Sequence, residues 1–355
     1  MKRFRIIGLM SGTSLDGLDI ADVEFFQSKN ESWSFKLVHS ETVDYTAEFK
    51  EKLRKAPFLS GEELGILSVE LGRYYGQEVL SFLEKYGIDK AIISAVASHG
   101  QTIFHQPDKG FTLQIGNGPE LSAITGLKSV VDFRTQDVAL GGNGAPLVPV
   151  ADDYLFSNLA DSFLNIGGFA NVSFKKRDWL SFDICPANIV LNEIMQHFNQ
   201  PFDLNGDKGR SAEVNKDLLE ELDALDYYSQ DGPKSLGWEW VENEVLPTLK
   251  KEDDELTKLG TFYSHIAYQI ARSLEKNNLK SVFVTGGGAK NSFLIELIKQ
   301  QFKGEVIIPE KDIIDSKEAI AFAFLGVLRL NNVINVYASV TGARKNSCSG
   351  VVFTP

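Results

Sequence analysis

Small hydroxyl, glycine and acidic residues gather in one short turn near the N-terminus. The sequence "SGTSLDG", Ser11–Gly17, lies between two apolar runs that are typical of β-strands, and it contains no lysine. Backbone N–H groups and hydroxyls in such a turn can point into one concavity, and a nest of this kind suits a phosphate. A bland hairpin more often uses a two-residue Asn-Gly or Asp-Gly turn, so the alternative is an ordinary loop.

Two further glycine clusters favour a phosphate ligand. "NIGG" ends in Gly167 and Gly168 between two short strand-like runs, and "TGGGAKN", with Gly286–Gly288, lies between a strand and a helix. Glycines at such turns let a phosphate or a flat base approach the backbone closely. The three clusters in this order predict nucleotide binding. No G-x-x-x-x-G-K-[ST] motif occurs, so the chain is not a P-loop enzyme.

Polar side chains follow two of the predicted strands, in the segments "SHGQT" and "DFR". Folds of alternating strands and helices bind ligands at the carboxyl ends of the strands. Gln101 and Thr102 suit sugar hydroxyl or amide groups, and Arg134 suits a carboxylate that it can bind through two parallel hydrogen bonds. A plain turn and a surface arginine are the alternatives. His99 either orients its loop or touches the ligand.

Three aspartates are candidates for acid–base or metal chemistry. Asp183, in "SFDICPANIV", ends an apolar run just before a helical pattern, where it could act as a general base or simply cap the helix. Asp16 and Asp19 follow the first turn. We expect either of them to hold Mg²⁺ through water, because this ion loses its water reluctantly.

The elements that position these residues alternate between strands and helices. Helical patterns near residues 47–55 and 62–86 precede a buried strand, and this alternation predicts a largely parallel sheet. Two hairpins with small-residue turns, each opening an α/β half, indicate an internal repeat of domain size. We predict domains at residues 1–135 and 136–355, with a C-terminal tail that packs back on the first. The two turns would hold the phosphates of one nucleotide from both sides.

Composition excludes several other classes of protein. The chain has 355 residues, 43% of them apolar and 24% charged, which is ordinary globular usage and enough for two cores. A net charge of -12 makes nucleic acid a poor partner. Cys185 and Cys348 do not form a metal-type pair. The apolar runs at residues 6–10 and 319–328 are too short for a signal peptide or a membrane span, so we expect a cytoplasmic protein.

Nine segments, taken in order, resemble the signature segments of the anhydro-N-acetylmuramic acid kinase family, from residue 7 to about residue 350. They are "GLMSGTSLDGLD", "HGQT", "TLQIG", "DFR", "DVALGGNGAPLVP", "NIGGFANVS", "VTGGGAKN", "EAIAFAFLG" and "SVTGA". The family belongs to the superfamily of sugar kinases, actin and heat-shock chaperone ATPases. The resemblance therefore implies an α/β protein in which two ribonuclease-H-like domains enclose a central cleft.

The resemblance also implies an activity. These kinases open the anhydro bridge of 1,6-anhydro-N-acetylmuramic acid with water and transfer the γ-phosphoryl group of ATP to O6. The product is N-acetylmuramic acid 6-phosphate, in the recycling of the cell wall. Phosphoryl transfer of this kind normally uses Mg²⁺ on the phosphates. We therefore expect ATP and an amino sugar as small-molecule partners and Mg²⁺ as cofactor, with a monomer and a homodimer both left open.

Roles for individual residues follow from the same resemblance. Asp183 stands where the family segment D-T-G-P-G-N has its catalytic carboxylate. Glu318 stands where the family glutamate reaches the sugar, and a first-turn acid favoured by the helix dipole is its alternative. The expected sugar ligands are His99, Gln101, Thr102, Arg134, Asn188 and Glu318. The expected nucleotide ligands are Ser11, Gly12, Thr13, Ser14, Asp16, Gly17, Asp19, Gly167, Gly168, Gly286, Gly287, Gly288 and Asn291.

Two segments depart from the family pattern. After Asp183, the residues Ile184, Cys185 and Ala187 replace threonine and two glycines, and in "KSLGWEW" Trp238 replaces an arginine. Added side-chain volume could narrow the site or raise the pKa of Asp183 through desolvation. These changes keep open a related amino-sugar kinase, or a sugar-binding protein, with a different substrate. A non-enzymatic nucleotide switch of actin type is a further alternative.

Overall fold

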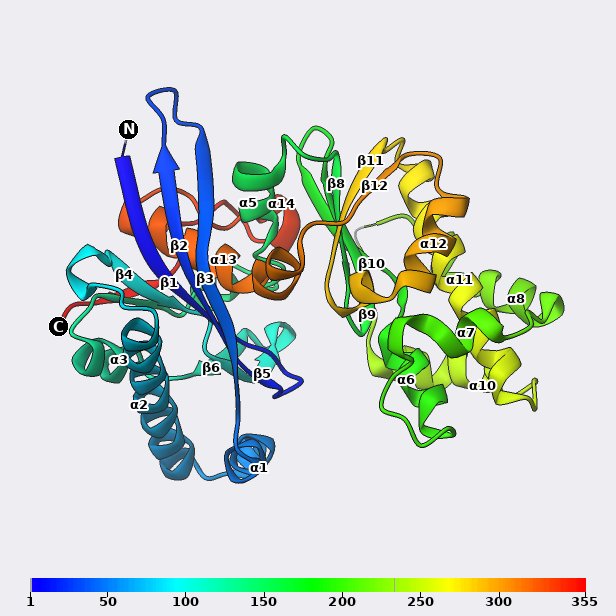
Figure 1. Cartoon of the computed structure of the whole chain (residues 1–355), viewed down its shortest axis with the longest axis horizontal. Coiled ribbons are helices and arrows are strands. Elements are labelled where there is room, and N and C mark those ends of the chain that lie inside the picture. Colours follow the sequence, from blue (N-terminus) through cyan, green and yellow to red (C-terminus); the bar gives the residue numbers. More distant parts are fainter. Residues whose placement is uncertain (1, 233) are drawn as a thin grey trace. The chain divides into compact units, whose positions relative to one another are not determined.

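The chain divides into two compact units in the computed structural model, which describes residues 2–232 and 234–355 (Figure 1). Unit 1 comprises Met1–Phe156 and Ser316–Pro355, and unit 2 comprises Ser157–Asp315. The boundary that we expected at residues 135/136 falls inside unit 1. Residues up to 156 belong to unit 1 because Asp152 forms an ion pair with Lys317 (2.9 Å) and Phe156 packs on Phe35.

Unit 1 is built on a six-stranded sheet in the order β13-β7-β4-β1-β2-β3. Strand β2 is antiparallel to β1 and β3, whereas β4 and β7 run parallel to β1. Without the edge strand β13, this is the strand arrangement of the ribonuclease-H fold. The strands are β1 (Lys2–Ser11), β2 (Gly17–Gln27), β3 (Trp33–Asp44), β4 (Ala95–Ser98), β7 (Ser129–Val131) and β13 (Val351–Phe353), and a separate hairpin consists of β5 (Gln101–Gln106) and β6 (Phe111–Ile115).

Helices cover both faces of this sheet. Ile7 and Leu9 of β1 join one core with Leu71 and Phe82 of α2. On the other face α13 lies so close to β1 that a Cβ on Gly8 would be 2.1 Å from the Ala319 carbonyl oxygen. The helices of unit 1 are α1 (Ala47–Lys55), α2 (Gly61–Lys85), α3 (Gly118–Thr125), α4 (Thr135–Ala139), α5 (Pro149–Ala151), α13 (Lys311–Leu330, from Ser316 on) and α14 (Ala338–Thr341).

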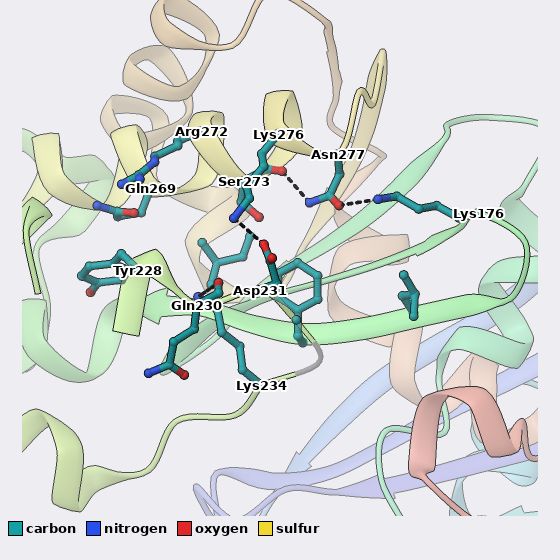
Figure 2. Close-up of a pocket in the computed structure, with 14 residues that line it drawn as sticks. Lys176, Tyr228, Gln230, Asp231, Lys234, Gln269, Arg272, Ser273, Lys276 and Asn277 are labelled. Atoms are coloured by element: carbon teal, nitrogen blue, oxygen red, sulfur yellow. Dashed lines mark hydrogen bonds and ion pairs between the residues drawn. The ribbon is translucent and has the colours of Figure 1, made fainter. Parts of the chain in front are cut away.

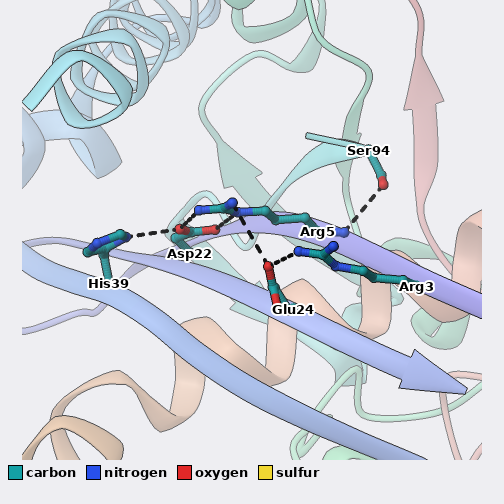
Figure 3. Close-up of polar contacts among 6 residues, drawn as sticks. All are labelled: Arg3, Arg5, Asp22, Glu24, His39 and Ser94. Carbon is teal, nitrogen blue, oxygen red and sulfur yellow. Dashed lines mark hydrogen bonds and ion pairs between the residues drawn. The ribbon is translucent and has the colours of Figure 1, made fainter. Parts of the chain in front are cut away.

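A charged cluster joins the first three strands (Figure 3). The Asp22 carboxylate is fully buried and accepts two hydrogen bonds from Arg5, at 2.8 and 2.6 Å, while His39 Nδ1 lies 3.2 Å from it. Removing one partner of a buried charge pair leaves the other uncompensated, which typically costs about 3–5 kcal/mol. The basic residues Arg3 and Arg5, which follow the N-terminus, therefore belong to strand β1.

Unit 2 repeats this topology. Its five-stranded sheet has the order β10-β9-β8-β11-β12, with β9 antiparallel to both neighbours and β11 and β12 parallel to β8. The matching pattern in the two units confirms the predicted internal repeat and the ribonuclease-H-like class of both halves. The strands are β8 (Ser162–Ile166), β9 (Phe169–Lys175), β10 (Trp179–Pro186), β11 (Ser281–Thr285) and β12 (Glu305–Ile307).

The core of unit 2 lies between this sheet and helices α6, α11 and α12. Leu164 and Val284 from the sheet pack with Val190, Ile266 and Ile298 from the three helices. The helices are α6 (Asn188–Gln196), α7 (Asp207–Ser211), α8 (Lys216–Asp223), α9 (Trp238–Trp240), α10 (Leu246–Leu249), α11 (Glu255–Lys276) and α12 (Ser292–Gln301). Among the described residues, no helix has the length and apolar composition needed to cross a membrane.

Candidate active site

The first turn joins β1 to β2 and exposes most of its polar side chains. Thr13, Ser14 and Asp16 are exposed in the five-residue connection between the strands. The two glycines differ. A Cβ at Gly17 would lie 2.5 Å from the carbonyl oxygen of Val43, so the packing of β3 requires a glycine there. Gly12 has room for a Cβ, with the nearest atom at 3.5 Å.

Ser11 is not open to a ligand through its hydroxyl. Its Oγ donates to Gln101 Oε1 at 2.5 Å and lies 2.7 Å from the Tyr45 hydroxyl, which in turn lies 3.4 Å from the Tyr75 hydroxyl. Ser11 and Gln101 are 1% and 2% exposed. The network therefore ties the first turn to the start of β5. Sequence reasoning missed Tyr45 and Tyr75, which lie far away along the chain in apolar surroundings.

His99 and Arg134 form a second connected pair. Arg134 Nε donates to His99 Nε2 at 2.9 Å, and the other ring nitrogen of His99 donates to the Gly100 carbonyl at 2.9 Å. Burial, together with the positive charge of Arg134, lowers the pKa of His99 to about 3, so the ring is neutral near pH 7. Since both ring nitrogens are engaged, the structure favours the loop-orienting role for His99.

Arg134 is half-buried and precedes α4. Its Nη1 donates to the Gly144 carbonyl at 2.6 Å, and its Nη2 makes no hydrogen bond to any described residue. Burial lowers its pKa to about 10, against the opposing charges of Glu318 and Asp137, so the guanidinium stays protonated at neutral pH. One end of the guanidinium thus remains available for an anion.

Glu318 is exposed on α13, well beyond the first turn of the helix, which starts at Lys311. The interpretation of Glu318 as a first-turn acid is therefore wrong. The carboxylate lies near Arg134 and Asp19, whose charges act on it in opposite directions. Asp19 accepts a hydrogen bond from Thr42 at 2.6 Å. Unit 1 thus brings Arg134, Glu318, Asp19 and His99 together.

Gln101 and Thr102 do not end a strand, contrary to expectation. β4 stops at Ser98, Gly100 turns the chain with a φ of 77°, and Gln101 begins β5 of a separate hairpin. The glycine permits this left-handed backbone, which a residue with a Cβ would adopt at a cost. Thr102 is half-buried, and its hydroxyl lies 3.3 Å from Gln114 Nε2.

The turn between β8 and β9 consists of Gly167 and Gly168, and it holds the start of α6. The Gly168 carbonyl accepts hydrogen bonds from the N–H groups of Ala187 (2.7 Å) and Ile189 (3.2 Å), and the Gly167 carbonyl accepts one from Asn188 (3.2 Å). A Cβ on either glycine would meet no atom closer than 3.6 Å. Packing therefore does not require glycine at these two positions.

The third cluster contains two structural glycines and one open one. A Cβ on Gly286 would lie 2.5 Å from Asn165 Oδ1, and this glycine also has a φ of 83°. A Cβ on Gly288 would lie 2.3 Å from Ile166 Cγ2. Gly287 is exposed, and its Cβ would meet only Asn188 Nδ2, at 3.8 Å. Gly287 begins the 3₁₀ turn η8 (Gly287–Lys290) before α12.

The structure places the two predicted asparagines beside this cluster. Asn188 donates to the Ile166 carbonyl at 3.3 Å, so it lies with the glycines of unit 2, whereas the other expected sugar ligands belong to unit 1. Asn291 is 9% exposed and caps α12 by accepting from Leu294 N–H, and its amide donates to the Tyr263 hydroxyl at 2.7 Å. The side chain of Asn291 is thus engaged within the fold.

Asp183 lies in strand β10, and the helix that follows has Ala187 at its N-cap position, so the N-cap alternative is wrong. Its Oδ2 accepts the Leu236 N–H at 2.9 Å, its backbone N–H donates to the Lys234 carbonyl at 3.0 Å, and its carbonyl accepts the Tyr227 hydroxyl at 2.6 Å. Its Oδ1 makes no hydrogen bond within the described chain. Burial raises the pKa of Asp183, against the Leu236 hydrogen bond.

The residues that depart from the family pattern take different places. Ile184, Cys185 and Ala187 are buried, so their added volume lies in the core beside Asp183. Trp238 begins α9 and is 39% exposed. Among the described residues, no group of three or more His, Cys, Asp or Glu side chains could hold a metal ion directly.

Comparisons with known proteins place the chain in a family. The family "Anhydro-N-acetylmuramic acid kinase" matches residues 4–355. Proteins named anhydro-N-acetylmuramic acid kinase are 35% identical in Sulfurovum sp. (99% of this chain, 100% of the relative) and 33% identical in Aliivibrio fischeri (98% and 99%). A solved ROK family glucokinase from Streptomyces griseus is only distantly similar, with 11% identity, coverage of 90% and 98%, and a TM-score of 0.41. The chain belongs to the anhydro-N-acetylmuramic acid kinase family.

Proposed function

We propose that the chain is an ATP-dependent kinase that opens 1,6-anhydro-N-acetylmuramic acid with water and phosphorylates it at O6. Membership of the family supports the substrate and the reaction, and the structural observation that carries the chemistry is the environment of Asp183. Its carboxylate is half-buried, has a raised pKa and is fixed through Oδ2, while Oδ1 is left for another partner. These are the properties of a general base, whose pKa is tuned toward the working pH.

Four glycines are the best candidates for contact with the nucleotide. The protein leaves room for a Cβ at Gly12, Gly167, Gly168 and Gly287, so packing does not explain why glycine stands there. A ligand that approaches the backbone closely would explain it. The packing of the protein accounts for Gly17, Gly286 and Gly288 without a ligand. The exposed hydroxyls of Thr13 and Ser14 would add donors at the first turn, where no lysine is available.

Arg134 is the candidate for the acidic group of the sugar. Its Nη2 can bind the lactyl carboxylate, while Nε and Nη1 remain held by His99 and Gly144. Glu318 and the half-buried Thr102 would contact the polar groups of the sugar. Because both nitrogens of its ring are occupied, His99 positions Arg134 and does not itself bind the substrate.

The reaction needs a proton acceptor for the attacking water and a positive charge on the phosphates of ATP. Asp183 takes a proton from water as the water oxygen bonds to the anomeric carbon, and the bond from that carbon to O6 breaks. O6 then bonds to the γ-phosphorus and ADP leaves. Mg²⁺ bound to the phosphates would neutralise their charge, and the exposed carboxylate of Asp16 could hold it through water. Since the reaction consumes ATP, which cells keep in the cytoplasm, we expect the chain to act there.

Replacement of the base tests the proposal. In Asp183→Asn the amide keeps the shape of the side chain but cannot accept the proton, so we expect turnover to fall by ~10²–10⁴-fold with nucleotide binding retained. Asp178→Asn is the matched control, since Asp178 is exposed just before β10. If Asp183→Asn turns over as fast as Asp178→Asn, Asp183 is not the general base.

Trp238 supports a second candidate function, a kinase for a related amino sugar. It stands where the family usually has an arginine, so a charged contact is lost there, and its ring is partly exposed. Turnover with a panel of amino sugars that differ at the lactyl group distinguishes the two. A higher kcat/KM for a sugar without the lactyl group would favour the second candidate.

A further inference from the structure

A cationic hollow of about 310 Å³ lies in unit 2 (Figure 2), and none of the residues that line it belongs to the three glycine turns. It lies between the carboxyl-terminal half of α11, strand β10 and the residues Gln230, Asp231 and Lys234. Four cations and one carboxylate line it, in a chain whose net charge is -12. They are Lys176, Lys234, Arg272, Lys276 and Asp231.

The topology separates this hollow from the expected nucleotide site. The Gly167–Gly168 turn precedes the first residue of β9, and Lys176 follows its last residue. Lys176 and the turn therefore lie at opposite ends of this strand. Phe182 lines the hollow. Side chains of successive residues in a strand point to opposite faces, so the Asp183 carboxylate lies on the other face of β10.

Carboxylates neutralise few of these cations. Lys276 pairs with Asp231 at 2.5 Å, and Lys176 donates only to the neutral amide of Asn277 at 2.9 Å. The guanidinium of Arg272 is exposed and forms no hydrogen bond or ion pair with any described residue. The cations therefore repel one another with little compensation.

Lys234 shows the effect of this repulsion. Its ammonium group donates to the carbonyls of Tyr227 (2.7 Å) and Gln230 (3.1 Å), which are neutral acceptors. Burial lowers its pKa, and the charges of Lys276 and Arg272 lower it further. The ammonium group also lies over the Tyr227 ring, 4.0 Å from its centroid, so all its contacts within the described chain are with neutral groups and no carboxylate there neutralises it. A bound anion would relieve this repulsion.

Lys234 also connects the hollow to Asp183. Its carbonyl accepts the Asp183 N–H at 3.0 Å, and two residues later the Leu236 N–H donates to Asp183 Oδ2 at 2.9 Å. Tyr227 holds both residues, because its hydroxyl donates to the Asp183 carbonyl while its own carbonyl accepts from Lys234. A ligand that fixes Lys234 would therefore fix the backbone that orients Asp183.

We propose that this hollow binds a phosphate group, free or as a monoester of a small metabolite, and thereby stiffens the segment that holds Asp183. Phosphate carries about -1.5 to -2 charges near pH 7 with three or more acceptor oxygens, which matches cations that come from both the helix and the loop. Arg272 supplies the planar fork that phosphate prefers. The volume lies at the lower end of the range for small-molecule sites.

Titration calorimetry with inorganic phosphate and, separately, with a hexose 6-phosphate tests the binding. A non-hydrolysable ATP analogue with Mg²⁺ is present throughout, so that the expected nucleotide site is filled. We expect saturable binding that Arg272→Gln and Lys276→Gln each weaken by at least ~10-fold, because each change removes a charge-assisted hydrogen bond to the phosphate. Lys299→Gln, at an exposed lysine on α12, is the matched control and should bind like the wild type.

The same samples test the link to Asp183. We expect phosphate to slow hydrogen exchange at the amides of Asp183 and Leu236 in the wild type and in Lys299→Gln, and to leave Arg272→Gln unaffected. Tighter binding of the ester would identify a phosphorylated metabolite as the ligand, and equal binding would identify the phosphate group alone. Absence of saturable binding of either compound, or equal binding in Arg272→Gln and Lys299→Gln, overturns the proposal.

Discussion

Gly287 is the position where an added side chain separates a ligand effect from a folding effect. In Gly287→Val the new Cβ would have its nearest protein neighbour, Asn188 Nδ2, at 3.8 Å, which is an ordinary contact. The glycine does not have a positive φ, so valine is compatible with the backbone. We therefore expect the free energy of unfolding to change by less than about 1 kcal/mol.

The effect on the nucleotide should be larger. If the nucleotide approaches the backbone of Gly287 in van der Waals contact, the valine side chain occupies its space. Overpacking of a close contact typically costs ~1–3 kcal/mol, which corresponds to about 5- to 150-fold in Kd. Gly287→Ala should show a smaller increase in the same direction, because its methyl group is smaller.

Gly288→Ala provides the opposite pattern. Its Cβ would lie 2.3 Å from Ile166 Cγ2, so it should lower the stability by ~1–3 kcal/mol through overpacking. Urea unfolding measures the stability of each variant, and calorimetry with a Mg²⁺-bound ATP analogue measures its affinity. Wild-type nucleotide affinity in folded Gly287→Val would refute the reasoning, and so would a failure of this variant to fold.

Two further predictions concern Arg134 and His99. Arg134→Ala should raise the KM for the acidic anhydro sugar strongly, since truncating a charge-assisted pair commonly costs ~2–5 kcal/mol, and should change the KM for ATP little; equal losses on anhydro-N-acetylglucosamine, which lacks the carboxylate, would show that Arg134 only supports its loop. His99 has a pKa near 3 in the folded chain, below the ordinary value of about 6.5, so between these values the unfolded chain binds a proton that the folded chain excludes. The free energy of unfolding of the wild type should therefore fall as the pH drops through this range, by up to about 1.4 kcal/mol per pH unit more than that of His99→Gln. Urea unfolding at several pH values measures this difference, and parallel pH dependences of the two proteins would contradict it.

The turns and the repeat could be predicted from the sequence because they depend on local residue types. Glycine and small hydroxyl residues between apolar runs indicated both hairpins, and the strand orders of the two units agree with the repeat. The prediction was wrong where a boundary depends on packing. α13 begins at Lys311 and not at Glu318. The apolar run in the sequence marks only the part of the helix that packs on the sheet, and the polar first turns precede it.

The sequence could not show which glycines the fold itself requires. Gly286, Gly287 and Gly288 look alike in the sequence, and only the neighbours of each Cβ, which come from β8 and α6, distinguish them. The partners of Asp183 were hidden for the same reason. Tyr227 and Leu236 reach it from segments more than forty residues away along the chain, and no local pattern marks them.

The most direct test of the proposed activity is to incubate the protein with ATP, Mg²⁺ and anhydro-N-acetylmuramic acid in ¹⁸O-labelled water. Mass spectrometry then gives the mass of the sugar product and, from its fragments, the position of the label. Early time points are used, because the anomeric oxygen of a free sugar exchanges slowly with water. We predict N-acetylmuramic acid 6-phosphate with one ¹⁸O at the anomeric carbon and none in the phosphate, formed in equal amount with ADP. Unphosphorylated sugar together with ¹⁸O-labelled inorganic phosphate, or an intact anhydro bridge, would contradict the proposal.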